Sequence, residues 1–185
     1  MKYLLLGLCL CVSVANSRAK SKDFVFEAEQ LYQQAMDKNQ AGLLVEASVL
    51  FTQAIALDNQ QPHYFHHRGL SFFGMGELNQ GIKDFNQAVN LKTTELSVYL
   101  KLISHYMKNS QYMAVLIITD QLAANLPNQA AGAYYDKGRA YEAMHNFTMA
   151  KAAYQASLNQ LGNDQADFRK LLENKIQEIE QQERE

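Results

Sequence analysis

Cysteine is scarce in this chain. Its 185 residues include only Cys9 and Cys11, and both lie close to the amino terminus. The rest of the sequence therefore has no disulfide framework. A bacterial lipoprotein signal places a small residue directly before its cysteine, but here Leu8 and Leu10 occupy those positions. We therefore do not expect an acyl anchor.

Proline and glycine are also few, at two and nine residues. Alanine, leucine, glutamine, glutamate and lysine are abundant, and these residues have high helix propensity. The composition is that of a soluble globular protein. Its length suits one domain or a short array of repeats, and it does not require two domains.

An excess of basic charge is missing as well. The formal net charge is −2, and no Lys/Arg cluster interleaved with aromatic residues occurs. Proteins that bind nucleic acid neutralise phosphates with such clusters. We therefore expect no nucleic-acid partner.

The amino terminus has the order of a secretory signal peptide. Lys2 precedes an uncharged apolar run over residues 3–14, and small residues follow at Ala15 and Ser17. We predict a signal peptide over 1–17, with cleavage after Ser17 and with Ala15 or Ala19 as alternative sites. The other interpretation is a membrane anchor, but the run is shorter than the ~20 residues that span a bilayer. Cleavage would leave no cysteine and no membrane span.

A period of 34 residues runs through the remaining sequence. One series contains Leu31, Phe65 and Tyr99, and another contains Gly42 and Gly76. After Pro127 one extra residue enters and the same order resumes. A fixed period of this length indicates stacked supersecondary units. We place four repeats at 28–61, 62–95, 96–130 and 131–163, after a short segment over 18–27.

Each repeat divides into two amphipathic segments. In the second repeat Phe65, Gly69 and Phe72 follow a helical spacing, and a second helical pattern begins after Gly76. Gly76 lies where the first helix must end, a position that favours a left-handed glycine cap. Gly69 and Gly81 lie inside helices, where glycine costs about 1 kcal/mol relative to alanine. We predict that they allow close backbone approach beneath facing aromatic rings.

These residues resemble the tetratricopeptide repeat family, and the resemblance covers about 28–161. The second and fourth repeats follow its pattern of small and aromatic positions most closely, and the third diverges most. The matching residues are Leu31, Ala35, Gly42, Ala47, Phe51 and Ala54; Phe65, Gly69, Phe72, Gly76, Gly81, Phe85 and Ala88; Tyr99, Leu102, Tyr106 and Pro127; and Tyr134, Gly138, Tyr141, Ala150, Tyr154 and Ser157.

The resemblance implies an all-α, right-handed superhelical solenoid of about four helix-turn-helix repeats. After position 163 the sequence has the pattern of an amphipathic helix with one apolar and one polar face. This pattern predicts a capping helix over 164–185, with Asn163 or Asp164 as its N-cap. The apolar face contains Phe168, Leu171, Leu172, Ile176 and Ile179.

The sequence gives little support for catalysis or for a metal site. His63 and His67 share a helical face next to His66, but a zinc site needs further ligands, and His105 and His145 belong to other repeats. The glycines of residues 69–76 are not followed by the Lys-Ser/Thr of a phosphate-binding loop. No G-x-S-x-G elbow occurs either. We therefore expect neither an enzyme nor a cofactor.

The resemblance implies a binding surface instead, because the first helix of each repeat lines a concave groove in this family. The predicted groove residues are Tyr32, Met36, His63, His66, Leu70, Phe73, Leu100, Ser104, Met107, Tyr135 and Arg139. Co-chaperone members bind a carboxyl-terminal peptide through Lys, Asn and Arg, but here Tyr32, Met36 and His67 occupy equivalent positions. An alternative is that residues 20–27 cover part of this face.

The sequence thus predicts an exported adaptor that binds a protein or peptide partner, with the bacterial periplasm and its envelope or secretion machinery as the expected setting. One alternative is a structural subunit that self-assembles through its repeats. Another is a secreted or lumenal eukaryotic protein, in which the Asn146-Phe147-Thr148 sequon would carry a glycan.

Overall fold

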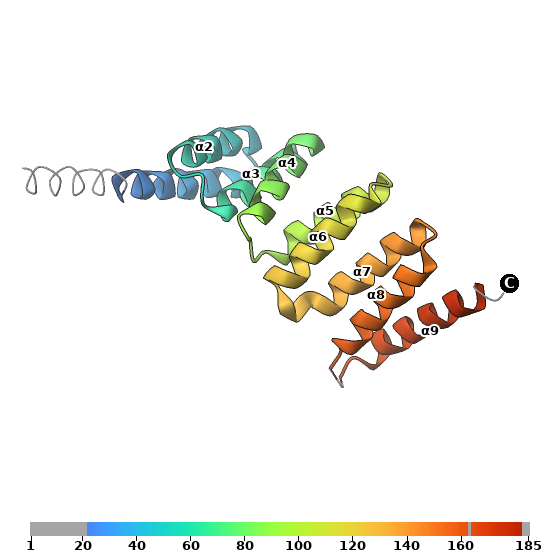
Figure 1. Cartoon of the computed structure of the whole chain (residues 1–185). Helices are drawn as coiled ribbons and strands as arrows, with labels where there is room; N and C mark the ends of the chain where they lie inside the picture. The colour runs from blue at the N-terminus through green and yellow to red at the C-terminus, as the bar shows by residue number, and fades with distance from the viewer. Residues whose placement is uncertain (1–21, 163, 183–185) are drawn as a thin grey trace, which may run out of the picture. The chain divides into compact units, whose positions relative to one another are not determined.

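The computed structural model describes residues 22–162 and 164–182. The chain forms two compact units, Met1–Leu91 and Lys92–Glu185, which we call unit 1 and unit 2. The described residues are helical with short turns and contain no strand, so the all-α prediction is confirmed (Figure 1). The predicted signal peptide over 1–17 and residues 18–21 lie outside the described residues.

Unit 1 consists of two helical hairpins. A first helix covers residues 22–40 and is followed by α2 (Leu44–Leu57), α3 (Pro62–Gly74) and α4 (Leu78–Asn90). Within the unit, α2 packs on α3 and α3 packs on α4. Pro62 is the first residue of α3, a position that suits proline because the first helical N–H has no partner within the helix.

Unit 2 contains two more hairpins and a terminal helix. They are α5 (Leu96–Lys108), α6 (Tyr112–Asn125), a 3₁₀ turn (Pro127–Gln129), α7 (Ala130–Ala143), α8 (Phe147–Asn159) and α9 (Ala166–Gln182). Each α-helix packs on the next one, and α9 packs on α8. Of the two predicted caps, Asn163 lies outside the described residues. Asp164 is wrong, because α9 begins at Ala166, and Arg169 N–H donates to the Gln165 carbonyl at 2.9 Å.

The α3–α4 and α7–α8 hairpins pack a ring against a glycine. A Cβ on Gly69 would lie 2.7 Å from the Phe85 ring, and one on Gly138 would lie 2.4 Å from the Tyr154 ring. A Cβ on Gly81 would lie 2.2 Å from the Phe73 ring. The predicted packing role of these glycines is therefore confirmed.

The third repeat reverses this arrangement of large and small residues. Ile103 stands at the position of Gly69, and Thr119 stands at the position of Phe85. Both are buried, at 4% and 1% exposure. A larger side chain on α5 thus accompanies a smaller one on α6, and this exchange roughly conserves volume, which protein cores tolerate best.

The turns between paired helices place one residue in the left-handed region. Gly42 and Gly76 have φ angles of +76° and +80°. Ser110 and His145 stand at the equivalent positions of the third and fourth repeats, and both have φ of 57°. The glycine cap predicted at Gly76 is confirmed, while the last two turns adopt this conformation without glycine.

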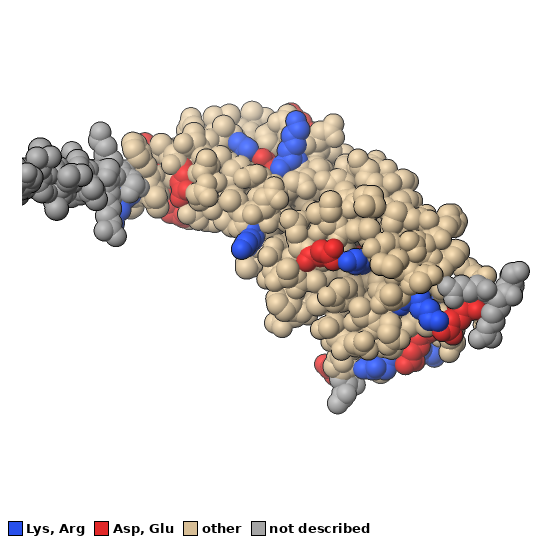
Figure 2. Space-filling view, viewed as in Figure 1, with Lys and Arg blue, Asp and Glu red and all other residues tan. Residues whose placement is uncertain are grey.

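Charged residues are few and scattered on the face drawn in Figure 2, where blue and red atoms lie next to one another in several places. This distribution agrees with the net charge of −2. None of the described helices is long and apolar enough to cross a membrane.

Candidate functional site

The inner-face residues predicted in unit 1 form an aromatic cluster between the first helix and α3. The Tyr32 ring lies 4.8 Å from the His63 ring and 5.7 Å from the Phe51 ring, between centroids. Met36 and Tyr32 pack against the buried cluster of Ala35, Ala47 and Phe51, and Leu70 is half-buried. These side chains join the helices of unit 1.

One of the unit 1 groove predictions needs correction, and another residue has a packing role beside the predicted one. His66 is buried, with 6% exposure, and its ring lies 6.1 Å from the Phe85 ring. Phe73 covers Gly81, and its ring centroid lies 5.0 Å from that of Phe85. His66 therefore belongs to the packing between α3 and α4, whereas Phe73 fills the space above Gly81 and stays partly exposed.

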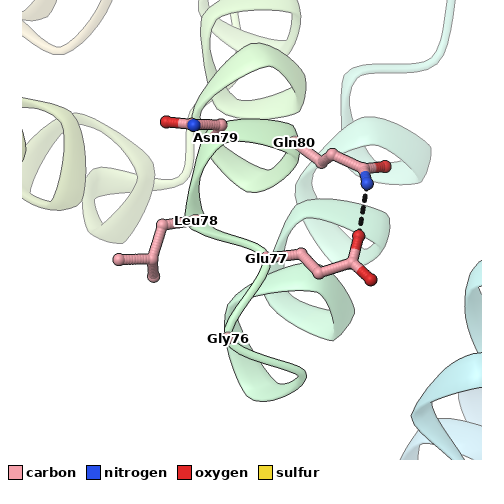
Figure 3. Close-up of a pocket in the computed structure, with 5 residues that line it drawn as sticks. All are labelled: Gly76, Glu77, Leu78, Asn79 and Gln80. Carbon is pink, nitrogen blue, oxygen red and sulfur yellow. Dashed lines mark hydrogen bonds between the residues drawn. The ribbon is translucent and has the colours of Figure 1, made fainter.

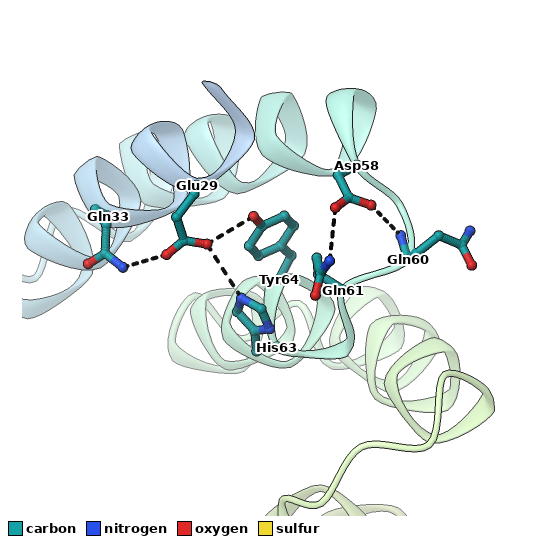
Figure 4. Close-up of polar contacts among 7 residues, drawn as sticks. All are labelled: Glu29, Gln33, Asp58, Gln60, Gln61, His63 and Tyr64. Atoms are coloured by element: carbon teal, nitrogen blue, oxygen red, sulfur yellow. Dashed lines mark hydrogen bonds and ion pairs between the residues drawn. The ribbon is translucent and has the colours of Figure 1, made fainter. Parts of the chain in front are cut away.

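A polar network fixes the first helix against α3 (Figure 4). Glu29 accepts a hydrogen bond from the Tyr64 hydroxyl at 3.1 Å and lies 3.9 Å from His63 Nε2. Burial and the Glu29 carboxylate raise the pKa of Tyr64 far above its ordinary value. Gln33 donates to the other Glu29 oxygen at 2.8 Å. Glu29 thus has protein partners on both oxygens, which indicates a structural role.

Within the segment 20–27, residues 20 and 21 lie outside the described residues, and residues 22–27 do not cover this face as the alternative proposed. The described part of that segment is helical and exposed, and it continues into residues 28–40 without a break. Its first buried residue is Ala28.

In unit 2 the predicted residues line two adjoining cavities. One cavity, of about 350 Å³, is lined by Leu100, Ile103, Ser104, Met107, Asp136 and Arg139. The second, of about 480 Å³, is lined by Met107, Tyr135, Arg139, Glu142, Ala143 and Lys175. Met107 and Arg139 belong to both, so we treat the two as one site and call it the unit 2 groove.

Helical spacing places these side chains together. On α5, Leu100, Ser104 and Met107 follow one another at i, i+4 and i+7, so they share one face. On α7, Tyr135 and Arg139 do the same, and Glu142 and Ala143 continue the row. Leu100 is 47% exposed although it is apolar, and Ser104 is exposed too. The groove therefore has an accessible apolar wall.

Arg139 is the charged residue common to both cavities. Its Nη1 donates to Asp136 Oδ1 at 2.9 Å, and its guanidinium lies 5.8 Å from the centre of the Tyr135 ring. Burial raises the pKa of Asp136, and the Arg139 charge partly opposes that shift. The Arg139 side chain stays 45% exposed. A guanidinium has five N–H donors, so Arg139 can donate further hydrogen bonds to a ligand.

The opposite end of the groove is tied to α9. Lys175 Nζ lies 3.2 Å from Glu142 Oε1 and 3.1 Å from Glu178 Oε2. The Tyr154 hydroxyl donates to the other Glu142 oxygen at 2.6 Å. This network holds Glu142 in place and leaves the groove close to electrical neutrality.

Sequence reasoning missed five residues of this groove, namely Ile103, Asp136, Glu142, Ala143 and Lys175. The row of Tyr135 and Arg139 on α7 would have predicted residues 142 and 143 if it had been continued by one turn. Lys175 had no such signal, because it comes from a helix outside the repeat pattern.

A third cavity, of about 560 Å³, lies at the turn between α3 and α4 (Figure 3). It is lined only by the consecutive residues 76–80, and Glu77 accepts a hydrogen bond from Gln80 there. We do not regard this cavity as a binding site, because it is the hollow of a single turn. Among the described residues, no group of His, Cys, Asp and Glu is arranged to hold a metal ion.

The family model described as tetratricopeptide repeat matches residues 131–160, which span α7 and α8. No curated protein matches the chain. The match shows a tetratricopeptide repeat at residues 131–160, and the described helices form hairpins of the kind that this repeat builds.

Several solved structures have a similar fold. MamA of Desulfovibrio magneticus RS-1, from residue 41 to its end, is 17% identical with a TM-score of 0.54, over 85% of this chain and 96% of that one. Another MamA structure is 20% identical with a TM-score of 0.56, over 77% and 85% of the two chains. YrrB, a repeat protein with an unusual peptide-binding site, is 14% identical with a TM-score of 0.56, over 80% of each.

Proposed function

We propose that this chain is an exported adaptor that binds a segment of a partner protein in the unit 2 groove. The observation that carries the proposal is the pair of cavities that share Met107 and Arg139 and are lined by inner-face residues. The structural relative YrrB is described as having a peptide-binding site, which supports a ligand of the same class. The amino-terminal apolar run supports export, with the periplasm and its envelope or secretion machinery as the proposed setting.

The groove dimensions suit a short segment. Leu100 and Met107 are seven residues apart on α5, so their Cα atoms are separated by about 10 Å along the helix axis. An extended chain covers that distance with about three residues. Leu100, Met107 and Tyr135 can contact apolar side chains of the ligand, while Arg139 can donate to its carbonyl groups.

Met107 is a better probe of this site than the aromatic residues. The Tyr135 ring lies 5.5 Å from Phe168 of α9 and 5.9 Å from Tyr154, so its truncation would also weaken the attachment of α9. Phe73, which we expected to be a second contact for the ligand, is packed on Gly81 in unit 1. Met107 lines both cavities, and Met113 on α6 is a matched control because it is 66% exposed and lies outside them.

The test selects peptides from a random display library on the full chain and measures their affinity for variants. A contact at the centre of an interface contributes about 2 kcal/mol or more, so Met107→Ala should weaken binding about thirtyfold. Arg139→Ala should weaken it as well, and Met113→Ala should leave it unchanged. All variants should keep the parent melting temperature within a few degrees.

The opposite pattern would place the binding surface elsewhere. If Met113→Ala weakens binding and Met107→Ala does not, the ligand occupies the outer face of α6. If the chain selects no peptide and light scattering shows concentration-dependent assembly, it is a self-assembling subunit. Export is tested separately by intact mass of protein from its native compartment, where retention of Met1 would contradict it.

A further inference from the structure

The second helix of each repeat has a row of four outward positions that are exposed or half-buried. The positions are spaced by four, three and four residues, so they share one face of the helix. In the second and fourth repeats they hold polar or small residues. These are Asn79, Lys83, Asn86 and Asn90 on α4, and Thr148, Ala152, Gln155 and Asn159 on α8. The fold therefore does not need large apolar side chains in this row.

The first and third repeats nevertheless place large apolar side chains there. The row on α2 is Val45, Val49, Thr52 and Ala56, and the row on α6 is Met113, Ile117, Asp120 and Ala124. Val45 and Val49 are 66% and 53% exposed. Met113 and Ile117 are 66% and 59% exposed. Neighbouring apolar groups exposed at positions where the same fold accepts asparagine and lysine indicate a binding surface.

Of the two rows, the one on α2 is better suited to pack against another helix. Spacings of four, three and four residues are those of a coiled-coil seam, which pairs with a second helix. The α2 row carries no charge, and the one charged residue of α2, Glu46, is bound to Lys38 at 2.6 Å. The α6 row contains Asp120, which is bound to Lys137 at 2.6 Å. A helix packed on α6 would have to desolvate that ion pair, which costs free energy.

The α2 row is complementary to itself. In an antiparallel pair about a twofold axis, Val45 of one copy lies opposite Ala56 of the other, and Val49 lies opposite Thr52. Each larger side chain thus meets a smaller one, in the self-matching arrangement that a twofold interface requires. An uncharged row does not select an acidic or a basic partner, whereas a second copy supplies the same uncharged row in the matching register.

We infer that the outer face of α2 pairs with α2 of a second copy and forms a twofold symmetric dimer. This inference does not depend on the unit 2 groove, because all of its residues belong to unit 1. Val45 and Ala56 are separated by about 17 Å along the helix axis. A contact of this length stays below the roughly 1,200 Å² at which standard interfaces begin, so the dimer is weak and forms at micromolar or higher concentrations.

The test is sedimentation equilibrium of the full chain from micromolar to millimolar concentration. Intact mass confirms that all proteins have the same amino terminus. The test variant is Val45→Asn/Val49→Lys, which gives α2 the residues that α4 has at the equivalent positions, so it should fold. The matched control is Met113→Asn/Ile117→Lys, which makes the same changes at the equivalent positions of α6. Val49→Lys and Val49→Glu are measured separately and as an equimolar mixture.

We expect the parent chain to dimerise with a Kd that changes little with salt, because the contact is uncharged. The test variant should weaken dimerisation about tenfold or more, and the control should keep the Kd of the parent. All variants should retain helical circular dichroism and melt near the parent temperature. Val49→Lys and Val49→Glu should each dimerise less than the parent, because like charges meet across the axis, and their mixture should recover dimer.

Three results would overturn the inference. The first is a parent chain that stays monomeric at every concentration. The second is a test variant that dimerises as the parent does, or a control that loses the dimer. The third is a mixture of Val49→Lys and Val49→Glu that forms no more dimer than the separate variants, because the two α2 helices then do not face each other.

Discussion

Arg68 of α3 and Asp84 of α4 form a two-point ion pair inside unit 1. Arg68 Nε donates to Asp84 Oδ2 and Nη2 donates to Oδ1, both at 2.7 Å. The third nitrogen, Nη1, donates to Thr52 Oγ1 of α2 at 3.0 Å. The two side chains are only 18% and 8% exposed. One guanidinium thus connects three helices.

Asp84→Ala should strongly destabilise unit 1, because it leaves the Arg68 charge largely buried without its partner. Loss of one member of a buried pair costs about 3–5 kcal/mol in free energy of unfolding. The double variant Arg68→Met/Asp84→Leu should recover most of that loss, since it removes both charges and keeps apolar volume. Urea unfolding followed by circular dichroism measures both. If Asp84→Ala loses less than about 1 kcal/mol in free energy of unfolding, water compensates the Arg68 charge.

Gly81→Leu should destabilise the α3–α4 hairpin by about 1–3 kcal/mol, although leucine has the better helix propensity. The reason is that even a Cβ at this position would lie 2.2 Å from the Phe73 ring and 3.0 Å from the Gly69 carbonyl. Phe73→Ala should relieve part of this strain, so the two changes should be less than additive. Thermal melting of the parent, both single variants and the double variant provides a double-mutant cycle. Full additivity would mean that Phe73 is not the obstacle.

Ser110→Gly should stabilise the α5–α6 turn by about 0.5–1 kcal/mol. Ser110 has φ of 57°, and the left-handed region costs an ordinary residue about 1–2 kcal/mol. Glycine avoids this cost, but its greater entropy in the unfolded state offsets part of the gain in stability. Gly42→Ala provides the reverse test, because nothing lies within 4 Å of a Cβ there and the backbone angle alone determines the result. Its melting temperature should fall while that of Ser110→Gly rises.

Thr119→Phe should destabilise the third repeat by about 1–3 kcal/mol through overpacking. This repeat already carries Ile103 where the second repeat has Gly69. The double variant Ile103→Gly/Thr119→Phe restores the order found in the second repeat, and we expect it to be more stable than the sum of the single changes predicts. Denaturant midpoints of the three variants measure the coupling. A double variant that is no better than additive would show that Ile103 and Thr119 do not share one space.

The Tyr154 hydroxyl should make the protein sensitive to alkali. Burial and the Glu142 carboxylate raise its pKa far above its ordinary value of 10.0. The native state therefore holds this proton more tightly than the unfolded state does. As pH rises through about 10, the unfolded tyrosine ionises first and the free energy of unfolding falls.

Tyr154→Phe removes that difference. The variant should be less stable than the parent near pH 8, because a hydrogen bond to a charged acceptor contributes about 1.5–3 kcal/mol. The two proteins should become more alike by about pH 11. Urea unfolding midpoints of both proteins at about pH 8 and pH 11 test this expectation. A stability difference that is the same at both pH values would contradict it.

The repeat period made much of the fold predictable. Gly76 marks the end of α3 because few other residues adopt its φ angle, and Gly69 marks a close helix contact because a ring must fill the space above it. Both signals are local. The unit 2 groove was only partly predictable, since Lys175 reaches it from α9, whose position depends on a turn outside the repeat pattern. The burial of His66 was missed because spacing gives the direction of a Cβ and not the reach of its ring.

The packing of each helix on its neighbour in sequence also bears on how the chain folds. Among the described helices of each unit, the main contacts join consecutive elements and therefore close only short loops. Chains with such local contacts fold quickly, because little chain entropy is lost before each contact forms. Folding can begin at any hairpin and spread to the next. Thermal unfolding within unit 2 should begin at α9, which packs mainly on α8, and the earlier hairpins should retain their contacts after it detaches.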